Sequence, residues 1–324
     1  MEPLTEKILA QTDWFEQYGY YDFRAFVLEH YVRDEVVTHE VNALFASWLT
    51  HFYKLNTVTS MRIAIDSIGS LTYGFTTRSF LYEKSLGARL GFLLFYLDDM
   101  QLLDNARFSR FAEKYRQGQL DYDTAFLDVA YFKATVQEIA VLLDPGIRTL
   151  FLNYLDQWFA GALFETSREH KHQTFEERLE FKLLMCSMDL FFWIATVWIG
   201  TIDIHEIRPE VWEVAKNCFN RVVAYWNDIY FLGKELKENE YSSLLVAADV
   251  TVANLNERIR FLTDIIWSDL NKAVAVKKMA LNRSEQLLVT ECLNQSCGMF
   301  VWQETARRYT HFEHVYQPGS MEKV

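Results

Sequence analysis

Residues 87–108 read GARLGFLLFYLDDMQLLDNARF, and this stretch gives the clearest indication of the fold. It is long and apolar, it contains no proline, and its length suits a buried helix better than a strand. Helical patterning continues over almost the whole chain, which contains only 4 prolines and 12 glycines in 324 residues. We therefore predict an all-α protein with a single helical domain over residues 1–324, because no repeat or long linker divides the sequence.

Turn residues mark where several of these helices begin. Asp144-Pro145-Gly146 is a turn, and Pro209 stands near the first position of a helix, where a missing N–H costs nothing. The predicted helices cover roughly residues 4–18, 22–32, 35–53, 58–68, 77–103, 106–117, 121–143, 146–167, 173–200, 208–236, 240–246, 252–273 and 283–312.

Composition and charge exclude several classes of protein. A net charge of −12 without a run of Lys or Arg argues against nucleic acid as a partner. The 4 cysteines lack CxxC spacing, so we expect reduced thiols in a cytoplasmic protein. The N-terminus has no signal core, and the apolar stretch 183–200 contains Asp189, so we expect a buried helix and no transmembrane segment. The polar stretch around His170 and His172 is predicted to be a solvated loop.

Two adjacent carboxylates, Asp98 and Asp99, follow the leucines and aromatics of the apolar helix, and Asp104 comes six residues after Asp98. Buried anions are costly unless a positive group meets them. Mg²⁺ prefers carboxylate oxygens and often shares phosphate ligands with its substrate. The segment is therefore a candidate metal site, although an ordinary helix end that reaches solvent would look the same.

A second candidate segment is VVAYWNDIYFLGKELKE, residues 222–238. Asn227, Phe231 and Glu235 are spaced i, i+4, i+8 and so lie along one helix face. Lys234 stands next to Glu235, where it could pair with a phosphate oxygen. A solvated helix end is again the alternative.

A third candidate segment near the C-terminus reads FVWQETARRYTHF, residues 300–312. Trp302 is followed, after five residues, by Arg308 and Tyr309. Arginine suits phosphate because its planar fork makes two charge-assisted hydrogen bonds. An amphipathic terminal helix with an arginine pair on its surface would give the same pattern.

Taken in order, the three segments resemble the motifs of compact class I terpene synthases of the bacterial type and of their coral counterparts. The resemblance covers about two thirds of the chain, from the helix with Asp98 to Tyr309. It implies a class I terpenoid synthase-like helical bundle around a central apolar cleft. It also implies a cyclase that ionises an acyclic isoprenyl diphosphate by Mg²⁺-assisted loss of diphosphate and cyclises the carbocation.

The resemblance assigns metal ligands by position. Asp98 would bind two of three Mg²⁺ ions, with Asp99 beside it as a second catalytic carboxylate, and Asn227 and Glu235 would hold the third ion. Two positions depart from the family pattern: Leu102 stands where a carboxylate is expected, and Phe231 where Ser or Thr is expected. Asp104 could replace the missing carboxylate. Phenylalanine cannot bind a metal, so we expect weakened Mg²⁺ affinity.

The resemblance also assigns contacts to the diphosphate. Lys234, Arg308 and Tyr309 would bind it directly. In the family, a basic residue roughly 45 positions before the asparagine of the second motif senses the diphosphate. Lys182 lies 45 positions before it, and Arg178 lies one turn earlier on the same helix face. We favour Lys182.

The carbocation would need an apolar and electron-rich wall, which aromatic faces provide. Of several aromatic side chains near the motifs, we predict that Phe95, Trp302 and Phe192 bind the substrate. The resemblance favours geranylgeranyl diphosphate over farnesyl diphosphate. Two alternatives stay open, a chain-elongating prenyltransferase of the same fold and a non-catalytic helical scaffold derived from it, and a homodimer is a possible assembly.

Overall fold

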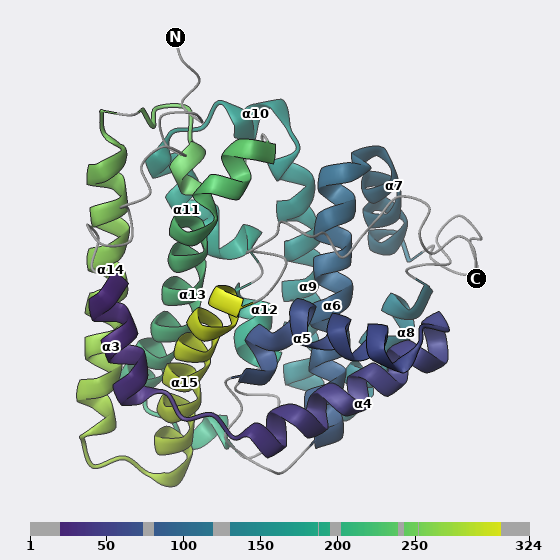
Figure 1. Cartoon of the computed structure of the whole chain (residues 1–324), viewed down its shortest axis with the longest axis horizontal. Helices are drawn as coiled ribbons and strands as arrows, with labels where there is room; N and C mark the ends of the chain where they lie inside the picture. The colour runs from purple at the N-terminus through teal and green to yellow at the C-terminus, as the bar shows by residue number, and fades with distance from the viewer. Residues whose placement is uncertain are drawn as a thin grey trace.

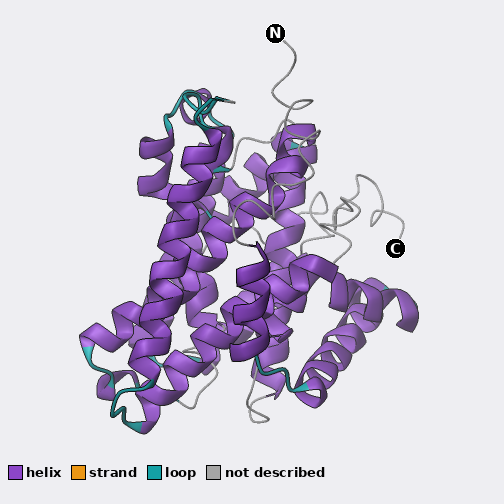
Figure 2. Cartoon of the chain, turned by 60° about the vertical axis from the view of Figure 1, so that its left-hand side comes forward, coloured by secondary structure: helices purple, strands orange, loops and turns teal. Residues whose placement is uncertain are grey.

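The computed structural model describes residues 20–73, 81–118, 130–186, 188–194, 202–238, 243–251 and 253–305. All regular structure in these ranges is helical, as Figure 2 shows, which confirms the predicted all-α class. The helices are α3 (Tyr20–His30), α4 (Glu35–Tyr53), α5 (Thr57–Tyr73), α6 (Leu81–Leu103), α7 (Asn105–Arg116), α8 (Ala130–Leu142), α9 (Pro145–Glu165), α10 (Arg168–Lys171), α11 (Phe175–Met185), α12 (Met188–Phe192), α13 (Pro209–Glu238), α14 (Leu255–Lys277) and α15 (Arg283–Thr305), with short 3₁₀ helices η3 (Ile204–Glu206) and η4 (Leu244–Val246).

The helices form two groups that share α15. In one group α13 packs against α14 and α15, with α3 and α14 on the left of Figure 1. In the other, α6 packs against α4, α5, α7 and α8, on the right of the same view. Helix α15 contacts α13 in the first group and α5 in the second, while α9, α11 and α12 lie between α13 and α7. Helices α6 and α13, which carry the two acidic segments, thus belong to different groups, and α15 contacts both groups.

Local sequence signals explain many of the helix ends. Asp34 accepts hydrogen bonds from the backbone N–H groups at the start of α4, and Thr174 forms a capping box with Glu177 at the start of α11. Pro145 occupies the first turn of α9, as predicted from the turn before it. These helix ends therefore follow from side chains within a few residues of them.

The predicted continuous helix over residues 173–200 is wrong. Helix α11 ends at Met185, and α12 begins at Met188. At the end of α11, the backbone N–H of Cys186 donates to the carbonyl oxygen of Lys182 at 3.1 Å, and its thiol donates to the same oxygen at 2.7 Å. The two halves of this segment therefore belong to separate helices.

Within the described ranges, no helix combines the length and the hydropathy that crossing a bilayer requires. Residues 183–200 are the apolar stretch considered above as a transmembrane segment. The first residues of this stretch belong to α11 and α12. Asp189 of α12 accepts a hydrogen bond from Asn220 at 2.8 Å and forms an ion pair with Lys216 at 2.7 Å. Both partners lie on α13, so Asp189 fastens α12 to that helix.

Candidate functional site

The acidic pair of α6 divides between two environments. In the stretch 90–101 only Phe95 and Asp98 are partly exposed, and every other residue is buried. These two residues are three apart and share one helix face. Asp99, by contrast, is 1% exposed. Within residues 90–101, the part of α6 that packing leaves accessible therefore carries one aromatic ring and one carboxylate.

Asp104 has a local structural role. It is the N-cap of α7, and its Oδ1 accepts a hydrogen bond from the backbone N–H of Arg107 at 3.2 Å. An N-cap carboxylate satisfies one of the amide groups that the first turn of a helix leaves without a partner. The structure thus explains Asp104 by the start of α7, without a metal.

On α13 the second acidic segment presents a buried carboxylate to α11. Asp228 is fully buried, and its Oδ1 lies 2.5 Å from Nζ of Lys182. Its Oδ2 accepts a hydrogen bond from the backbone N–H of Leu244 at 2.9 Å. Glu235, seven residues later on the same helix face, is 4% exposed. Sequence reasoning had placed Asp228 only as the neighbour of Asn227.

Two buried cations of α11 face this carboxylate. Burial by itself would lower the pKa of Lys182, but the carboxylate of Asp228 outweighs it, so the pKa lies above its ordinary value. Burial also lowers the pKa of Arg178, against the charges of Asp228 and Glu235. Burial raises the pKa of Asp228, and the ammonium of Lys182 opposes that rise. The two predicted sensor residues thus belong to one cluster with Asp228 and Glu235.

Glu165 at the end of α9 connects this cluster to α6. Its Oε2 accepts a hydrogen bond from Nε2 of Gln101 at 3.3 Å, and the same amide donates to the carbonyl oxygen of Ala162 at 2.7 Å. Gln101 lies one turn beyond Asp98. Glu165 also acts on the pKa of Arg178. The end of α6 and the charged residues of α11 are therefore connected through one carboxylate, which no sequence motif marked.

Helix α15 connects the same two segments from another side. The ring centre of Trp302 lies 6.1 Å from that of Phe95 on α6. The next residue, Gln303, donates from Nε2 to Oδ1 of Asn227 on α13 at 3.1 Å. Consecutive residues of α15 thus reach both candidate helices. The structure brings together Phe95 and Trp302, two of the three aromatic residues predicted to bind the substrate.

The third predicted aromatic residue, Phe192, lies elsewhere. It is fully buried, with its ring centre 5.1 Å from Trp212 and 6.2 Å from Phe219. Its neighbour Phe191 instead stacks near Phe95, with ring centres 6.4 Å apart and planes 27° from parallel. Two adjacent rings of α12 therefore point to different places, and the sequence offered no signal to choose between them.

His170, predicted to lie in a solvated loop, is fully buried. Its Nδ1 is 2.9 Å from Oε1 of Gln173, and its carbonyl oxygen accepts a hydrogen bond from Nη2 of Arg178 at 3.2 Å. His172 is exposed, as expected. The prediction fails at His170 because α10 folds back against the end of α9, a tertiary contact that local polarity does not reveal.

Some predicted residues lie outside what the structure describes. Arg308 and Tyr309 are outside the described residues, and Lys234 belongs to α13 but its side chain is not described. Among the described residues, no group of three or more His, Cys, Asp and Glu side chains is gathered closely enough to hold a metal ion. The donors of Asp98, Asn227 and Glu235 are carboxylate and amide oxygens, the type that fits Mg²⁺.

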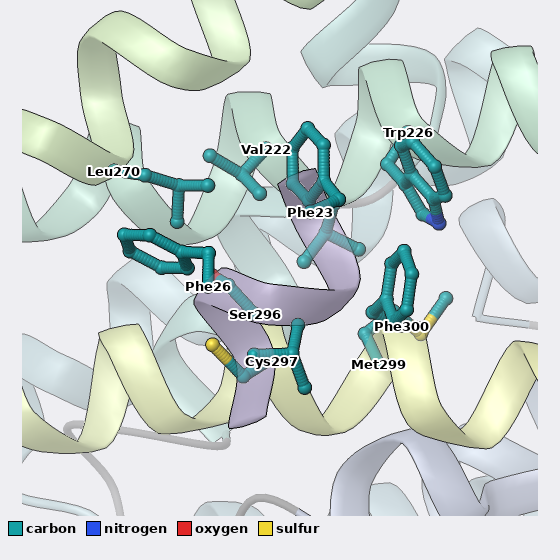
Figure 3. Close-up of a pocket in the computed structure, with 11 residues that line it drawn as sticks. Phe23, Phe26, Val222, Trp226, Leu270, Ser296, Cys297, Met299 and Phe300 are labelled. Carbon is teal, nitrogen blue, oxygen red and sulfur yellow. The ribbon is translucent and has the colours of Figure 1, made fainter. Parts of the chain in front are cut away.

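A small cavity under α3, shown in Figure 3, is separate from these residues. It measures about 10 Å³, roughly the space for one water molecule. Rings of Phe23 and Phe26 from α3, Trp226 from α13 and Phe300 from α15 surround it. None of the predicted site residues lines it. The cavity is therefore a packing gap between α3 and the helices beneath it.

Solved structures of the same fold are bacterial terpene synthases. Hedycaryol synthase, solved with HEPES, has a TM-score of 0.63 at 13% identity, over 85% of this chain and 96% of that one. Linalool/nerolidol synthase from Streptomyces clavuligerus has a TM-score of 0.58 at 12% identity, over 82% of this chain and 95% of that one. Germacradien-4-ol synthase from Streptomyces citricolor has a TM-score of 0.50 at 16% identity, over 83% and 92%. At these identities the likeness establishes the fold.

Sequence comparison supplies the family. The family described as "Terpene synthase family 2, C-terminal metal binding" matches residues 92–268, which include both acidic segments and α11. No curated protein matches the chain in sequence. The fold and the family match agree on a class I terpene synthase. The chain belongs to terpene synthase family 2, whose members are lyases that act on prenyl diphosphates with a divalent metal.

Proposed function

We propose that this terpene synthase cyclises a C15 or C20 isoprenyl diphosphate at a site between α6, α11 and α13. The observation that carries the proposal is the buried cluster in which Lys182 and Arg178 face Asp228 and Glu235. Glu165 and Gln101 connect that cluster to the helix turn with Asp98. Cations and oxygen donors thus lie near one another inside an apolar bundle, as the ionisation of a diphosphate ester requires.

The proposed metal ligands are Asp98, Asn227 and Glu235, and three Mg²⁺ ions is the proposed number. When bound, the metal acts as a Lewis acid that spreads the negative charge of the leaving diphosphate. Asn227 already accepts a hydrogen bond from Gln303, so its oxygen is oriented by α15. Phe231 is 5% exposed and stands between Asn227 and Glu235 on the helix face, where it excludes water but donates no ligand.

The proposed roles of the remaining residues follow from their surroundings. Lys182 is held protonated by Asp228 and supplies a positive charge for the diphosphate. Lys234, Arg308 and Tyr309 are proposed to contact it from α13 and the C-terminal segment. Phe95, one turn from Asp98, and Trp302 beside it would present aromatic faces to the carbocation.

Substrate length belongs to the proposal. The likeness of the segment around Trp302 to compact diterpene cyclases favours geranylgeranyl diphosphate. Linalool/nerolidol synthase, with the same fold, was solved with 2-fluorogeranyl diphosphate, a shorter C10 analogue. The C20 choice depends on the likeness around Trp302 alone, and we propose a C20 substrate, with C15 as the next choice.

The deciding experiment supplies C10, C15 and C20 diphosphates separately with Mg²⁺ and analyses the hydrocarbon and alcohol products. We expect cyclic products from C20 or C15. Asp98→Ala should lower turnover by roughly 100-fold or more, because the ionising cluster loses a carboxylate. Asp156→Ala is the matched control, since Asp156 lies on the surface and pairs with Arg116. Near-normal turnover in Asp98→Ala, or diphosphate release with no cyclic product, would contradict the proposal.

One observation favours a non-catalytic scaffold as a second candidate. Phe231 and Leu102 replace expected ligands, and Phe231 is buried within the ligand face. A scaffold should show no Mg²⁺-dependent rise in melting temperature with inorganic diphosphate. A prenyltransferase would instead lengthen the allylic substrate only when isopentenyl diphosphate is added.

A further inference from the structure

One peptide group connects two buried charges of the site. The carbonyl oxygen of Ser243 accepts a hydrogen bond from Nη1 of Arg178 at 2.7 Å. The N–H of Leu244, on the same peptide group, donates to Oδ2 of Asp228 at 2.9 Å. In a trans peptide these two groups point in opposite directions. The peptide therefore lies between a guanidinium and a carboxylate, with its carbonyl toward the cation and its N–H toward the anion.

The chain of contacts continues to Lys182. With Oδ2 occupied by Leu244, the other oxygen of Asp228 lies 2.5 Å from Nζ of Lys182. The orientation of Asp228 is thus fixed from both sides, by a backbone amide and by an ammonium. Arg178 holds that backbone amide in place. It therefore acts on Lys182 through the peptide group and through Asp228, although both basic residues lie on α11.

Both terminal nitrogens of Arg178 bind backbone carbonyl oxygens. It is 0% exposed, and its second terminal nitrogen, Nη2, donates to the carbonyl oxygen of His170 at 3.2 Å. Its two terminal nitrogens therefore bind carbonyl groups from two separate segments, α10 and the connection from α13 to α14. A guanidinium in this arrangement stabilises the walls around the site.

We propose that Arg178 is a positioning residue, which holds the peptide group of Ser243 and Leu244 so that Asp228 orients Lys182, and that Lys182 is the cation of α11 that meets the diphosphate. This inference rests on the proposed function, because it assigns different roles to the two cations of the same site. It makes two separable claims, one about the backbone at Leu244 and one about the binding of diphosphate.

The first test needs no substrate. Amide hydrogen exchange of Leu244 should accelerate in Arg178→Gln, because the glutamine is shorter and carries no charge. Arg178→Lys keeps the charge and one donor, so it should restore part of the protection. If Arg178→Gln fails to fold, Arg178→Lys provides the same comparison with wild type. Unchanged exchange at Leu244 in the folded variants would overturn the positioning role.

The second test measures binding of inorganic diphosphate with Mg²⁺ by calorimetry. Arg178→Gln should weaken binding roughly tenfold, the size seen when a residue behind a ligand is lost. In the Asp228→Asn background, Arg178→Gln should not weaken diphosphate binding further, because Asp228 no longer connects Arg178 to Lys182. A merely structural role would not give this dependence on Asp228. Equal weakening in both backgrounds would mean that Arg178 contacts the diphosphate directly, and would overturn the proposal.

Arg258 offers a matched control. It pairs with Glu176 of α11 at 2.5 Å and with Asp249 at 3.4 Å, so it fastens α11 to the connection between α13 and α14 at a different place from Arg178. Arg258→Gln should leave diphosphate binding and the exchange of Leu244 unchanged. Loss of binding in Arg258→Gln to the same extent would show that any loosening of the connection suffices, and would overturn the specific role of Arg178. A wild-type protein that binds no diphosphate would instead refute the proposed function itself.

Discussion

Two lysines of similar burial show opposite behaviour in two regions of the molecule. Lys84, in the first turn of α6, is 1% exposed, and Lys182, on α11, is 3% exposed. Burial lowers the pKa of Lys84 to about 8, against the charges of Glu291, Asp34 and Glu83. The pKa of Lys182 is raised instead, because Asp228 outweighs the cost of burial.

The comparison shows what a buried charge needs. Three carboxylates act on Lys84 and still do not offset its loss of hydration. For Lys182, burial is outweighed by the carboxylate of Asp228 at 2.5 Å together with Cys186 and Glu235. Close contact with a buried partner therefore matters more than the number of charges nearby. The region of Lys182 is built to keep a positive charge, as a diphosphate site requires, and the region of Lys84 is not.

Replacing Lys182 should have the largest effect. Lys182→Met leaves the carboxylate of Asp228 buried without its cation, which should lower the free energy of unfolding by about 3–5 kcal/mol. Turnover should fall by roughly 100-fold or more. Urea unfolding and product formation measure the two effects, with Lys182→Arg as the charge-preserving control. A variant as stable as wild type would mean that the ion pair contributes nothing.

The region of Lys84 should respond to pH instead. Its folded-state pKa of about 8 lies below the unfolded value, about 10.4. Between these values the unfolded chain binds more protons, so stability should rise with pH, by up to about 3 kcal/mol. The measurement is the free energy of unfolding at pH 7 and pH 10 in wild type and Lys84→Met. We expect the free energy of unfolding to rise from pH 7 to pH 10 more in wild type than in Lys84→Met. Parallel changes with pH in the two proteins would contradict the prediction.

Phe191 and Phe192, the adjacent aromatic residues of α12, allow a similar comparison between two neutral side chains. Phe191→Leu should change the ratio of cyclic products, because this ring lies beside Phe95. Phe192→Leu should leave that ratio unchanged and lower the free energy of unfolding by about 1 kcal/mol, since its ring packs against Trp212 and Phe219. Product analysis and urea unfolding of both variants check this. Identical product ratios in Phe191→Leu and wild type would show that Phe191 does not belong to the aromatic wall expected around the carbocation.

The smallest effect is expected at Phe231. Phe231→Ser offers a hydroxyl between Asn227 and Glu235, so the Mg²⁺ concentration for half-maximal turnover should fall about threefold, or roughly 0.6 kcal/mol. A Mg²⁺ titration of turnover measures it, with Phe231→Ala as the control that makes space without adding a ligand. An equal shift in both variants would assign the effect to space and not to the hydroxyl.

Much of the fold was accessible from the sequence because helix ends depend on local groups. The predicted helix over residues 35–53 coincides with α4, and the prolines at 145 and 209 mark the starts of α9 and α13. The break after Met185, the burial of His170 and the roles of Glu165 and Arg178 were not accessible. Each depends on contacts between segments far apart in the chain, such as that of Arg178 with Ser243. The metal and diphosphate roles stay predictions, and they came from the order of three motifs.

Trp302 is fixed at its edge, because its Nε1–H donates to the carbonyl oxygen of Ile65 at 3.1 Å and the side chain is fully buried. Its indole has no other polar atom to satisfy, so the ring has little reason to turn. If the substrate binds against Trp302 as proposed, the ring is already in place. The loss of side-chain entropy that usually accompanies binding would then have been met during folding, before any turnover.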